Sequence, residues 1–276
     1  MDIAEKRVYA ERTGPTLAFV ASEVGLVRVA VSDDLVGEFG VVHRTPVRDV
    51  AAGDGRLAVA TAEDVLLASD DGAGPDLTTT AFGPAVAVGF EGDRLVAAAP
   101  PTDGDGGRVA RWDGTTWTTL GTADVRAADG DLLATADGVR RVRPGLPDVG
   151  LDDVRDVAAA GPGAATAAGL FALGNGWLRG REGDAEVVTA SRDGARAHAV
   201  VDGTLLARED GTWAPCSLPV DGRVVDVAYA PASTHLVTAD GTLLVDAGEG
   251  WRHRRLGVPD VRAVAVPTAR APDETD

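Results

Sequence analysis

The 276-residue chain has 43 acidic and 26 basic side chains, a formal net charge of −17 and an isoelectric point of about 4.5. This charge argues against a nucleic-acid-binding protein, which needs a basic surface, and against docking on anionic membranes. No apolar run is long enough to cross a membrane and the first residues hold no signal-peptide core, so we expect a cytoplasmic protein.

The basic residues are almost all arginine, since Lys6 is the only lysine. An acidic chain with so little lysine resembles proteins of salt-accumulating archaea, in which concentrated salt screens the repulsion between like charges. An ordinary acidic protein from a GC-rich genome is the alternative. Cys216 is the only cysteine, which excludes an internal disulfide and a cysteine metal cluster.

Three apolar runs near the N-terminus predict the first strands, at Leu17–Ala21, Leu26–Val31 and Val36–Val42. Similar segments then return about every 30 to 40 residues, a spacing typical of an array of small supersecondary units. Their first runs begin at Val47, Ala85, Asp124, Val154, Glu186, Val224 and Val261.

Each repeat contains a first apolar run, a turn, two further runs and a weaker fourth one. In the repeat that begins at Val47, the later runs are Leu57–Thr61, Val65–Ser69 and Leu77–Phe82. Runs of about five residues closed by Gly, Asp or Pro favour strands over helices. Two-residue links such as Asp202-Gly203 are typical of hairpins, because both positions tolerate positive φ.

The predicted strands lack a polar face. In Leu57–Thr61, for example, large residues alternate with small ones and not with charged ones, which indicates a sheet buried on both faces. Four-stranded sheets stacked radially, each packed between two neighbours, meet this condition. The sequence therefore predicts an all-β fold, a seven-bladed β-propeller of short four-stranded blades.

The two ends of the chain are expected to share a blade. Val261–Val266 is a first strand with nothing after it, whereas the N-terminal strands have no first strand before them. Pairing the C-terminal strand with the N-terminal blade closes the ring and removes an open edge. Arg7–Glu11 is the alternative inner strand of this blade. We expect one propeller domain over residues 1–267 and a polar C-terminal tail over residues 268–276.

Arginines recur near the start of the predicted inner strands, which surround the central channel. They are Arg48, Arg126, Arg155 and Arg262. Asp49, Asp156 and Asp260 accompany some of them, and Asp226 lies in the corresponding strand of a blade without the arginine. One interpretation is structural, with Arg–Asp pairs that tie neighbouring blades together. The other is an anion-binding site at the channel mouth.

His43 and Arg44 complete the candidate ligand-binding set, because they lie in the predicted connection to the next inner strand. His198 and His235 fall in predicted second strands and are expected to be buried. No two histidines have the spacing of zinc ligands, and no nucleophile or phosphate-loop motif occurs. The sequence therefore predicts no metal, no cofactor and no catalytic residue, and whether the protein is an enzyme stays open.

Tryptophans mark the predicted outer strands at Trp117, Trp177, Trp213 and Trp251. We expect them to fill the rim between blades, and stacking platforms for sugars are the alternative. Basic residues also cluster in outer strands, where charge prevents edge-to-edge association. They include Arg179, Arg181, Arg252, Arg254 and Arg255.

Three predicted turns resemble degenerate Asp-box hairpins, although none keeps the full S-x-D-x-G-x-T-W spacing. They are EDGTW (Glu209–Trp213), WDGTTW (Trp112–Trp117) and SDDG (Ser69–Gly72). Asp boxes are structural in the families that have them, which include sialidases and photosystem assembly propellers. The sialidase arginine triad and Tyr/Glu pair have no counterpart here, since Tyr9 and Tyr229 are the only tyrosines.

As a whole, from EKRVYAERTG near the start to VRAVAVP near the end, the chain resembles an uncharacterised haloarchaeal β-propeller family. This resemblance implies the fold and the class of organism, and it brings no activity with it. Two hypotheses remain. The first is a non-enzymatic, cytoplasmic and monomeric scaffold that binds another protein. The second is a small-anion-binding protein or enzyme with its site at the channel mouth.

Overall fold

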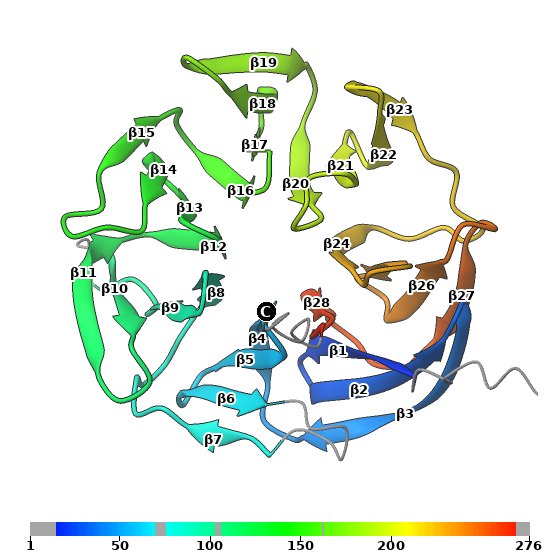
Figure 1. Ribbon diagram of the computed structural model, residues 1–276, viewed down its shortest axis with the longest axis horizontal. Helices are drawn as coiled ribbons and strands as arrows, with labels where there is room; N and C mark the ends of the chain where they lie inside the picture. Colours follow the sequence, from blue (N-terminus) through cyan, green and yellow to red (C-terminus); the bar gives the residue numbers. More distant parts are fainter. Residues whose placement is uncertain (1–14, 70–75, 103–105, 162, 269–276) are drawn as a thin grey trace, which may run out of the picture.

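The computed structural model describes residues 15–69, 76–102, 106–161 and 163–268. Within these ranges every regular element is a strand, and the strands form seven four-stranded antiparallel sheets. The sheets stand around a common axis as the blades of a ring (Figure 1). The predicted all-β, seven-bladed propeller is therefore confirmed.

The blades are numbered along the chain, and each is given with its strands from the axis outward. Blade 1 holds β28 (Ala263–Ala265), β1 (Thr16–Ser22), β2 (Gly25–Ser32) and β3 (Leu35–His43); blade 2 holds β4 (Val47–Gly53), β5 (Arg56–Thr61), β6 (Val65–Ser69) and β7 (Thr78–Thr79); blade 3 holds β8 (Ala87–Glu91), β9 (Arg94–Ala98), β10 (Gly107–Trp112) and β11 (Trp117–Ala123). Blade 4 holds β12 (Val125–Asp129), β13 (Leu132–Thr135), β14 (Gly138–Arg141) and β15 (Asp148–Gly150); blade 5 holds β16 (Val154–Ala158), β17 (Gly163–Thr166), β18 (Gly169–Leu173) and β19 (Trp177–Arg181); blade 6 holds β20 (Ala185–Ala190), β21 (Ala197–Val201), β22 (Thr204–Glu209) and β23 (Thr212–Pro215); blade 7 holds β24 (Val224–Tyr229), β25 (Thr234–Thr238), β26 (Thr242–Asp246) and β27 (Arg252–Arg255).

The ring closes in blade 1, where the C-terminal strand β28 pairs antiparallel with β1. The register sets Val264 opposite Val20, and the backbone N–H of Arg262 donates to the carbonyl of Ala21. β28 lies nearest the axis in Figure 1, so it is the inner strand of this blade, as predicted. The alternative strand Arg7–Glu11 lies outside the described residues.

The alternating strand directions give the ring two faces. The first face carries the connections between blades and the turns between second and third strands. The second face carries the turns that leave the inner strands and those that enter the outer strands. Residues at the start of an inner strand therefore lie near the first face.

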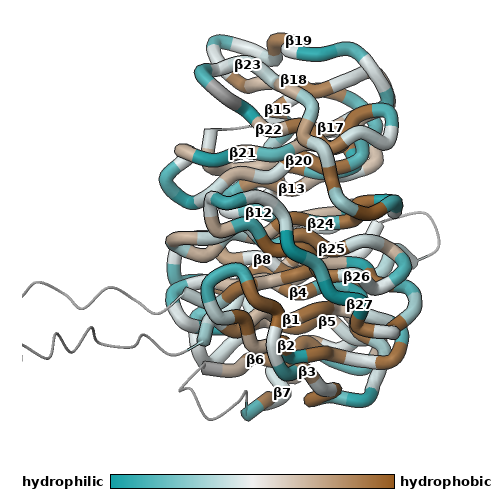
Figure 2. The backbone as a smooth tube through the Cα atoms, turned by 90° about the vertical axis from the view of Figure 1, so that its right-hand side faces the viewer, coloured by the Kyte–Doolittle hydropathy of each residue, from teal (hydrophilic) through white to brown (hydrophobic). Residues whose placement is uncertain are grey.

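The core lies between the blades as seven apolar clusters, one for each interface of the ring. Between blades 1 and 2, for instance, Phe19 and Leu26 pack with Leu57 and Val59. Hydrophobic residues run through the sheets and hydrophilic ones gather at the turns (Figure 2). Burial on both faces explains why the predicted strands show no polar side.

A hydroxyl group at the end of the second strand fixes the turn to the third strand in five blades. In four blades the hydroxyl donates to a backbone carbonyl three residues further along, at 2.7 to 3.3 Å. In blade 7, Thr238 Oγ1 donates to Asp240 Oδ1 at 2.5 Å and accepts the N–H of Thr242 at 3.2 Å. The donors are Ser22, Thr61, Thr135, Thr166 and Thr238, and all five are buried. This bond satisfies a hydroxyl inside an apolar interface and sets the length of the turn.

The outer strands differ most from the prediction. β15 was not predicted, because it has three residues and follows Pro144 and Pro147. β7 is shorter than the predicted run Leu77–Phe82, because the Asp64 carboxylate accepts the backbone N–H groups of residues 81–83 at 2.8 to 3.0 Å. These bonds draw the chain out of the sheet. Within the described ranges, no helix could cross a membrane.

Removal of residues 261–276 should open the ring, because it deletes β28 with the buried side chains of Val264 and Val266. We expect the free energy of unfolding to fall by roughly 5 kcal/mol, since burial of a valine stabilises by about 1.5–3 kcal/mol. Urea unfolding measures the change. A chain that ends at Thr268 keeps β28 and is the control. Equal stability of the two shortened chains would contradict closure through β28.

Candidate functional site

The arginines predicted to line the channel mouth lie near the first face. Arg48, Arg126 and Arg155 are the second residues of their inner strands, and Arg262 directly precedes β28. Arg126 of blade 4 donates to Asp153 Oδ1 at 2.6 Å and to Val154 O at 3.3 Å. Arg155 repeats this arrangement one blade further, with Asp184 Oδ1 at 2.6 Å. In both cases the carboxylate precedes the inner strand of the next blade. These two arginines therefore tie neighbouring blades together.

Arg48 and Arg262 depart from this arrangement. Arg48 Nη1 donates to Ala85 O at 3.4 Å, and the position that holds the aspartate in the other two pairs is Pro84 here. Arg262 instead donates to Glu23 Oε2 of its own blade at 3.1 Å. In the part of the chain that the structure describes, Arg48 is thus the one of these four arginines with no carboxylate partner.

Three aspartates hold the inner strands together by a different bond from the Arg–Asp pairing that the sequence indicated. One oxygen of each accepts the N–H of the following residue, at 2.7 to 2.9 Å. The other oxygen accepts an N–H from the inner strand of the next blade, at 2.8 to 2.9 Å. The three bridges are Asp49 to Val88, Asp156 to Val188 and Asp226 to Val264.

Burial raises the pKa of all three carboxyl groups, to about 7 for Asp49, about 8 for Asp156 and about 6 for Asp226. The accepted N–H bonds oppose this rise, whereas the charge of Asp226 adds to it at the other two. By surface area each side chain is only half-buried, so water near the axis moderates the effect. These aspartates therefore exchange protons closer to neutral pH than ordinary carboxyl groups.

Asp129 of blade 4 forms a fourth bridge, since it accepts the N–H of Ala159 in blade 5 at 2.7 Å. The surrounding protein raises the pKa of Asp129 through desolvation, but its side chain is exposed by surface area, so water weakens this effect more than at the other three aspartates. On the second face, Arg192 in the β20–β21 turn of blade 6 donates to the carboxylate of Asp54 in the β4–β5 turn of blade 2. Because blades 6 and 2 are not neighbours, this ion pair spans the axis.

The other predicted ligand-binding residues, His43 and Arg44, lie at the first face of blade 1. His43 is the half-buried last residue of β3, not part of the connection, and Arg44 is exposed. The β1–β2 turn lies against both, because a Cβ atom at Gly25 would fall 1.9 Å from His43 O. Gly25 has φ +127°, so this close approach requires glycine.

Two exposed valines accompany these residues. Val24 is 39% exposed in the β1–β2 turn and Val42 is 40% exposed near the end of β3. We call Val24, Val42 and Arg44 of blade 1, with Arg48 at the start of β4 in blade 2, the blade 1 patch. It combines apolar surface with two guanidinium groups that no carboxylate pairs with in the described ranges. His43 and Arg44 lie together beside the β1–β2 turn, whereas Arg48, Arg126, Arg155 and Arg262 make separate contacts at the inner strands.

The buried histidines have structural contacts. His198 Nδ1 lies 2.9 Å from Tyr229 Oη, and His235 Nε2 lies 2.9 Å from Ser233 Oγ. Burial lowers the pKa of both histidines to about 4, so both rings are neutral at physiological pH. Among the described residues, no three metal-ligating side chains come together.

Sequence reasoning missed the aspartate bridges, the exposed valines and the Arg192–Asp54 pair. The bridges had a signal in the sequence, because Asp49, Asp156 and Asp226 are each the third residue of a predicted inner strand. The two exposed valines had no such signal, since valine is a common residue in strands and its exposure cannot be told from the sequence. Arg192 and Asp54 lie far apart in the chain, and no sequence spacing connects them.

A family model described as HVO_0234-like, beta propeller, matches residues 2–267. No curated protein matches the chain. Among solved structures, a functionally unknown protein from Desulfotomaculum acetoxidans DSM 771 superimposes with a TM-score of 0.65 and 11% sequence identity. The match covers 92% of this chain and 99% of the other.

Two further solved structures have the same fold. YCF48 bound to D1 peptide has a TM-score of 0.54 and 15% identity over 75% of this chain and 81% of that one. Apo AztD from Citrobacter koseri has a TM-score of 0.56 and 12% identity over 90% of this chain and 84% of that one. At such identities the likeness extends to the fold alone.

The raised pKa values predict a pH dependence of stability. The folded chain keeps protons on Asp49 and Asp156 where the unfolded chain, with a pKa near 3.8, has lost them. The stabilisation of the folded chain by these protonated carboxyl groups is complete below about pH 3.8, and it is lost as the pH rises through about 7 to 8. The melting temperature at constant salt should therefore fall between about pH 7 and 8, above the ordinary histidine pKa of 6.5, and level off at higher pH.

Asp156→Asn should flatten this slope, because an amide does not titrate. Asp113→Asn is the matched control, since the Asp113 carboxylate accepts hydrogen bonds from Thr115 and Thr116 in an exposed turn and has a lowered pKa. Scanning calorimetry at several pH values measures both variants. Equal slopes in the wild type and the Asp156→Asn variant would contradict the assignment.

Proposed function

Starting from the fact that this chain belongs to the HVO_0234-like β-propeller family, we propose that it is a non-enzymatic protein-interaction scaffold. Its binding surface is the blade 1 patch, and its partner is a protein segment with carboxylate and small apolar side chains. The observation that carries the proposal is that Arg44 and Arg48 have no carboxylate partner in the described ranges, and that Arg44 lies beside exposed Val42 and the turn that holds exposed Val24.

The charges of this patch favour an acidic partner. Carboxylates near the first face pair with arginines within the ring, as in Arg126–Asp153 and Arg155–Asp184. A partner carboxylate is the complement of a guanidinium that lacks one, because the planar fork donates two parallel hydrogen bonds. The valines supply contact area that stays effective when salt screens the charges.

Peptide recognition by a ring of this shape has a parallel among the structural neighbours, since YCF48 was solved bound to D1 peptide. Propellers present their loops on a rigid frame, and repeat architectures offer broad surfaces for recognition. By analogy of fold, this supports a protein as the partner class.

The proposed setting is the salt-rich cytoplasm of a halophilic archaeon. The net charge of −17 and the single lysine support this setting. In about 1 M salt the Debye length is only about 3 Å, which removes most repulsion between surface carboxylates. Binding under these conditions depends on direct arginine–carboxylate contact and apolar burial, and both are short-ranged.

A photo-crosslinking amino acid in place of Val24 should capture the partner in cells at native salt. Charge reversal by Arg44→Glu with Arg48→Glu should reduce the adduct about tenfold or more, since lost charge-assisted hydrogen bonds cost roughly 1.5–3 kcal/mol each. Leu35 is the matched control, because it is 68% exposed on the same blade but lies at the second face. The same adduct from Leu35, or an adduct that survives charge reversal, would contradict the proposal.

The melting temperature should rise by several degrees or more between about 0.1 and 2 M KCl, because the folded chain concentrates its negative charge more than the unfolded one. Differential scanning fluorimetry at fixed pH measures the change. Sucrose is the control, since it favours burial without screening charge. A rise with sucrose but none with KCl would argue against adaptation to salt.

A further inference from the structure

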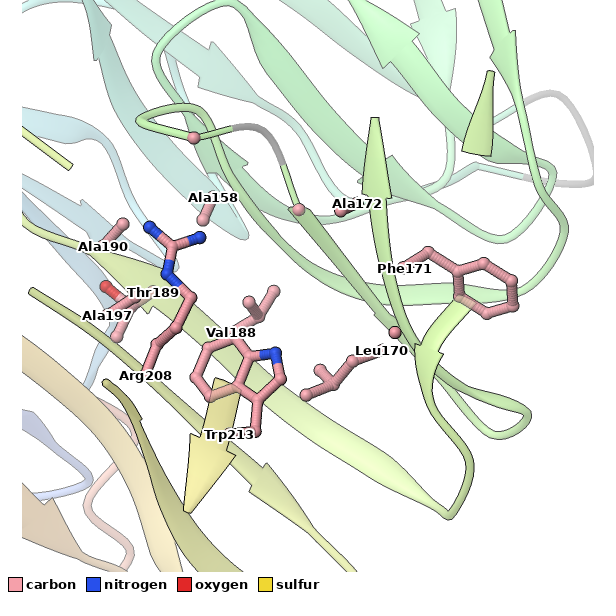
Figure 3. A pocket seen from close by; sticks show the side chains of 13 residues that line it. Ala158, Leu170, Phe171, Ala172, Val188, Thr189, Ala190, Ala197, Arg208 and Trp213 are labelled. Carbon is pink, nitrogen blue, oxygen red and sulfur yellow. The ribbon is translucent and has the colours of Figure 1, made fainter. Parts of the chain in front are cut away.

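A pocket lies between blades 5 and 6, on a different interface from the blade 1 patch (Figure 3). Its volume is about 50 Å³, enough for a few non-hydrogen atoms. The walls are mostly small or apolar, and Arg208 is the one charged side chain among the lining residues. They include Ala158, Gly163, Leu170, Ala172, Val188 and Ala190.

Trp213 lines this pocket and differs from its counterparts in the other blades. At three interfaces the indole N–H of the outer-strand tryptophan donates to the neighbouring blade. Trp117 donates to Thr80 O at 3.0 Å, Trp177 to Val149 O at 2.9 Å and Trp251 to Cys216 Sγ at 3.2 Å. Trp213 Nε1 has no such acceptor within the described residues. In Figure 3 its nitrogen lies on the side of the ring turned toward Leu170 and Phe171.

Arg208 also differs from related arginines. In the third strands of blades 3 and 4, Arg111 pairs with Glu91 and Arg141 pairs with Asp131. Arg208 occupies the third strand of blade 6, and its Nη2 donates to the carbonyl of Gly194 at 3.1 Å. No carboxylate of the described ranges pairs with it. The guanidinium has five N–H donors, so several remain available beside the pocket.

We propose that the pocket between blades 5 and 6 binds a short aliphatic group that ends in a carboxylate. The carboxylate accepts hydrogen bonds from Arg208, and the aliphatic part lies against the indole ring of Trp213, Leu170 and Val188. Arg208 lacks the carboxylate partner that Arg111 and Arg141 have in their blades, and a bound carboxylate supplies it.

The small volume selects a short chain of about three to five carbons. The source is either a free short-chain acid or the carboxyl terminus of a polypeptide that ends in a small aliphatic residue. Both present the same chemistry to the pocket. This site is independent of the proposed scaffold function, because it shares no residue with the blade 1 patch.

The test uses the full-length protein labelled with ¹⁵N and follows the indole N–H signals of its five tryptophans. Trp213→Phe assigns the signal of Trp213. Titration with sodium 3-methylbutyrate at constant ionic strength should move that signal to saturation. The signal of Trp177 should stay in place, because its N–H is already bonded to Val149 O.

Arg208→Gln should weaken binding about tenfold or more, whereas Arg111→Gln in blade 3 should leave it unchanged. Gly180→Leu should abolish binding, because a Cβ atom at Gly180 meets only Leu170 O at 4.0 Å and the longer side chain then fills the pocket. If the Gly180→Leu variant fails to fold, the Arg208→Gln comparison still decides the question.

Acetyl-Gly-Gly-Val with a free carboxyl terminus distinguishes the two sources. Saturation by this peptide alone assigns a polypeptide terminus, and saturation by 3-methylbutyrate alone assigns a free acid. Binding of both supports recognition of the shared group. The proposal is overturned if 3-methylbutyramide and the amidated peptide bind as tightly as the acids, or if no probe moves the Trp213 signal.

Discussion

The ring depends on how seven separate sheets are joined where their inner strands converge. Neighbouring inner strands belong to different sheets, so no ladder of backbone hydrogen bonds connects them. Aspartates provide the connection, because Asp49, Asp156 and Asp226 each accept N–H groups from two strands at once. Convergence also limits side-chain size, as at Gly89, where a Cβ atom would lie 2.8 Å from Ala128 O. The alternation of small residues and aspartate in these strands follows from this geometry.

The fold could be predicted from the sequence because its determinants repeat. Short apolar runs separated by Gly and Asp turns specify strands, and the unfinished repeats at the two ends specify closure through β28. The outer strands were harder to predict, since β7 ends where the Asp64 carboxylate accepts backbone N–H groups and β15 has only three residues, directly after Pro147. Such local competition is not visible in a pattern of hydrophobic residues.

The candidate site was predictable only in part. The recurrence of Arg48, Arg126 and Arg155 indicated ties between blades, and Arg126 and Arg155 do pair with carboxylates of the next blade. Whether an arginine has a partner depends on one residue of the next blade, and Pro84 in that position leaves Arg48 without one. Trp213 likewise lacks a partner for its indole N–H in the described ranges, whereas Trp117, Trp177 and Trp251 each donate to a neighbouring blade. In a repeat protein, a side chain that lacks the internal partner its counterparts have in the other repeats is therefore a candidate for ligand binding.

The Arg192–Asp54 pair joins turns that are 138 residues apart in the chain, on blades that are not neighbours in the ring. Both groups are partly exposed, with 67% and 33% of the side-chain area accessible, so their attraction adds at most about 1 kcal/mol. Its consequence concerns order of assembly. In a circular array each unit touches only the next, and structure can spread from any starting point. A link between opposite units forms after the circle is complete, so this ion pair arises late in folding and is among the first interactions to break when the circle opens.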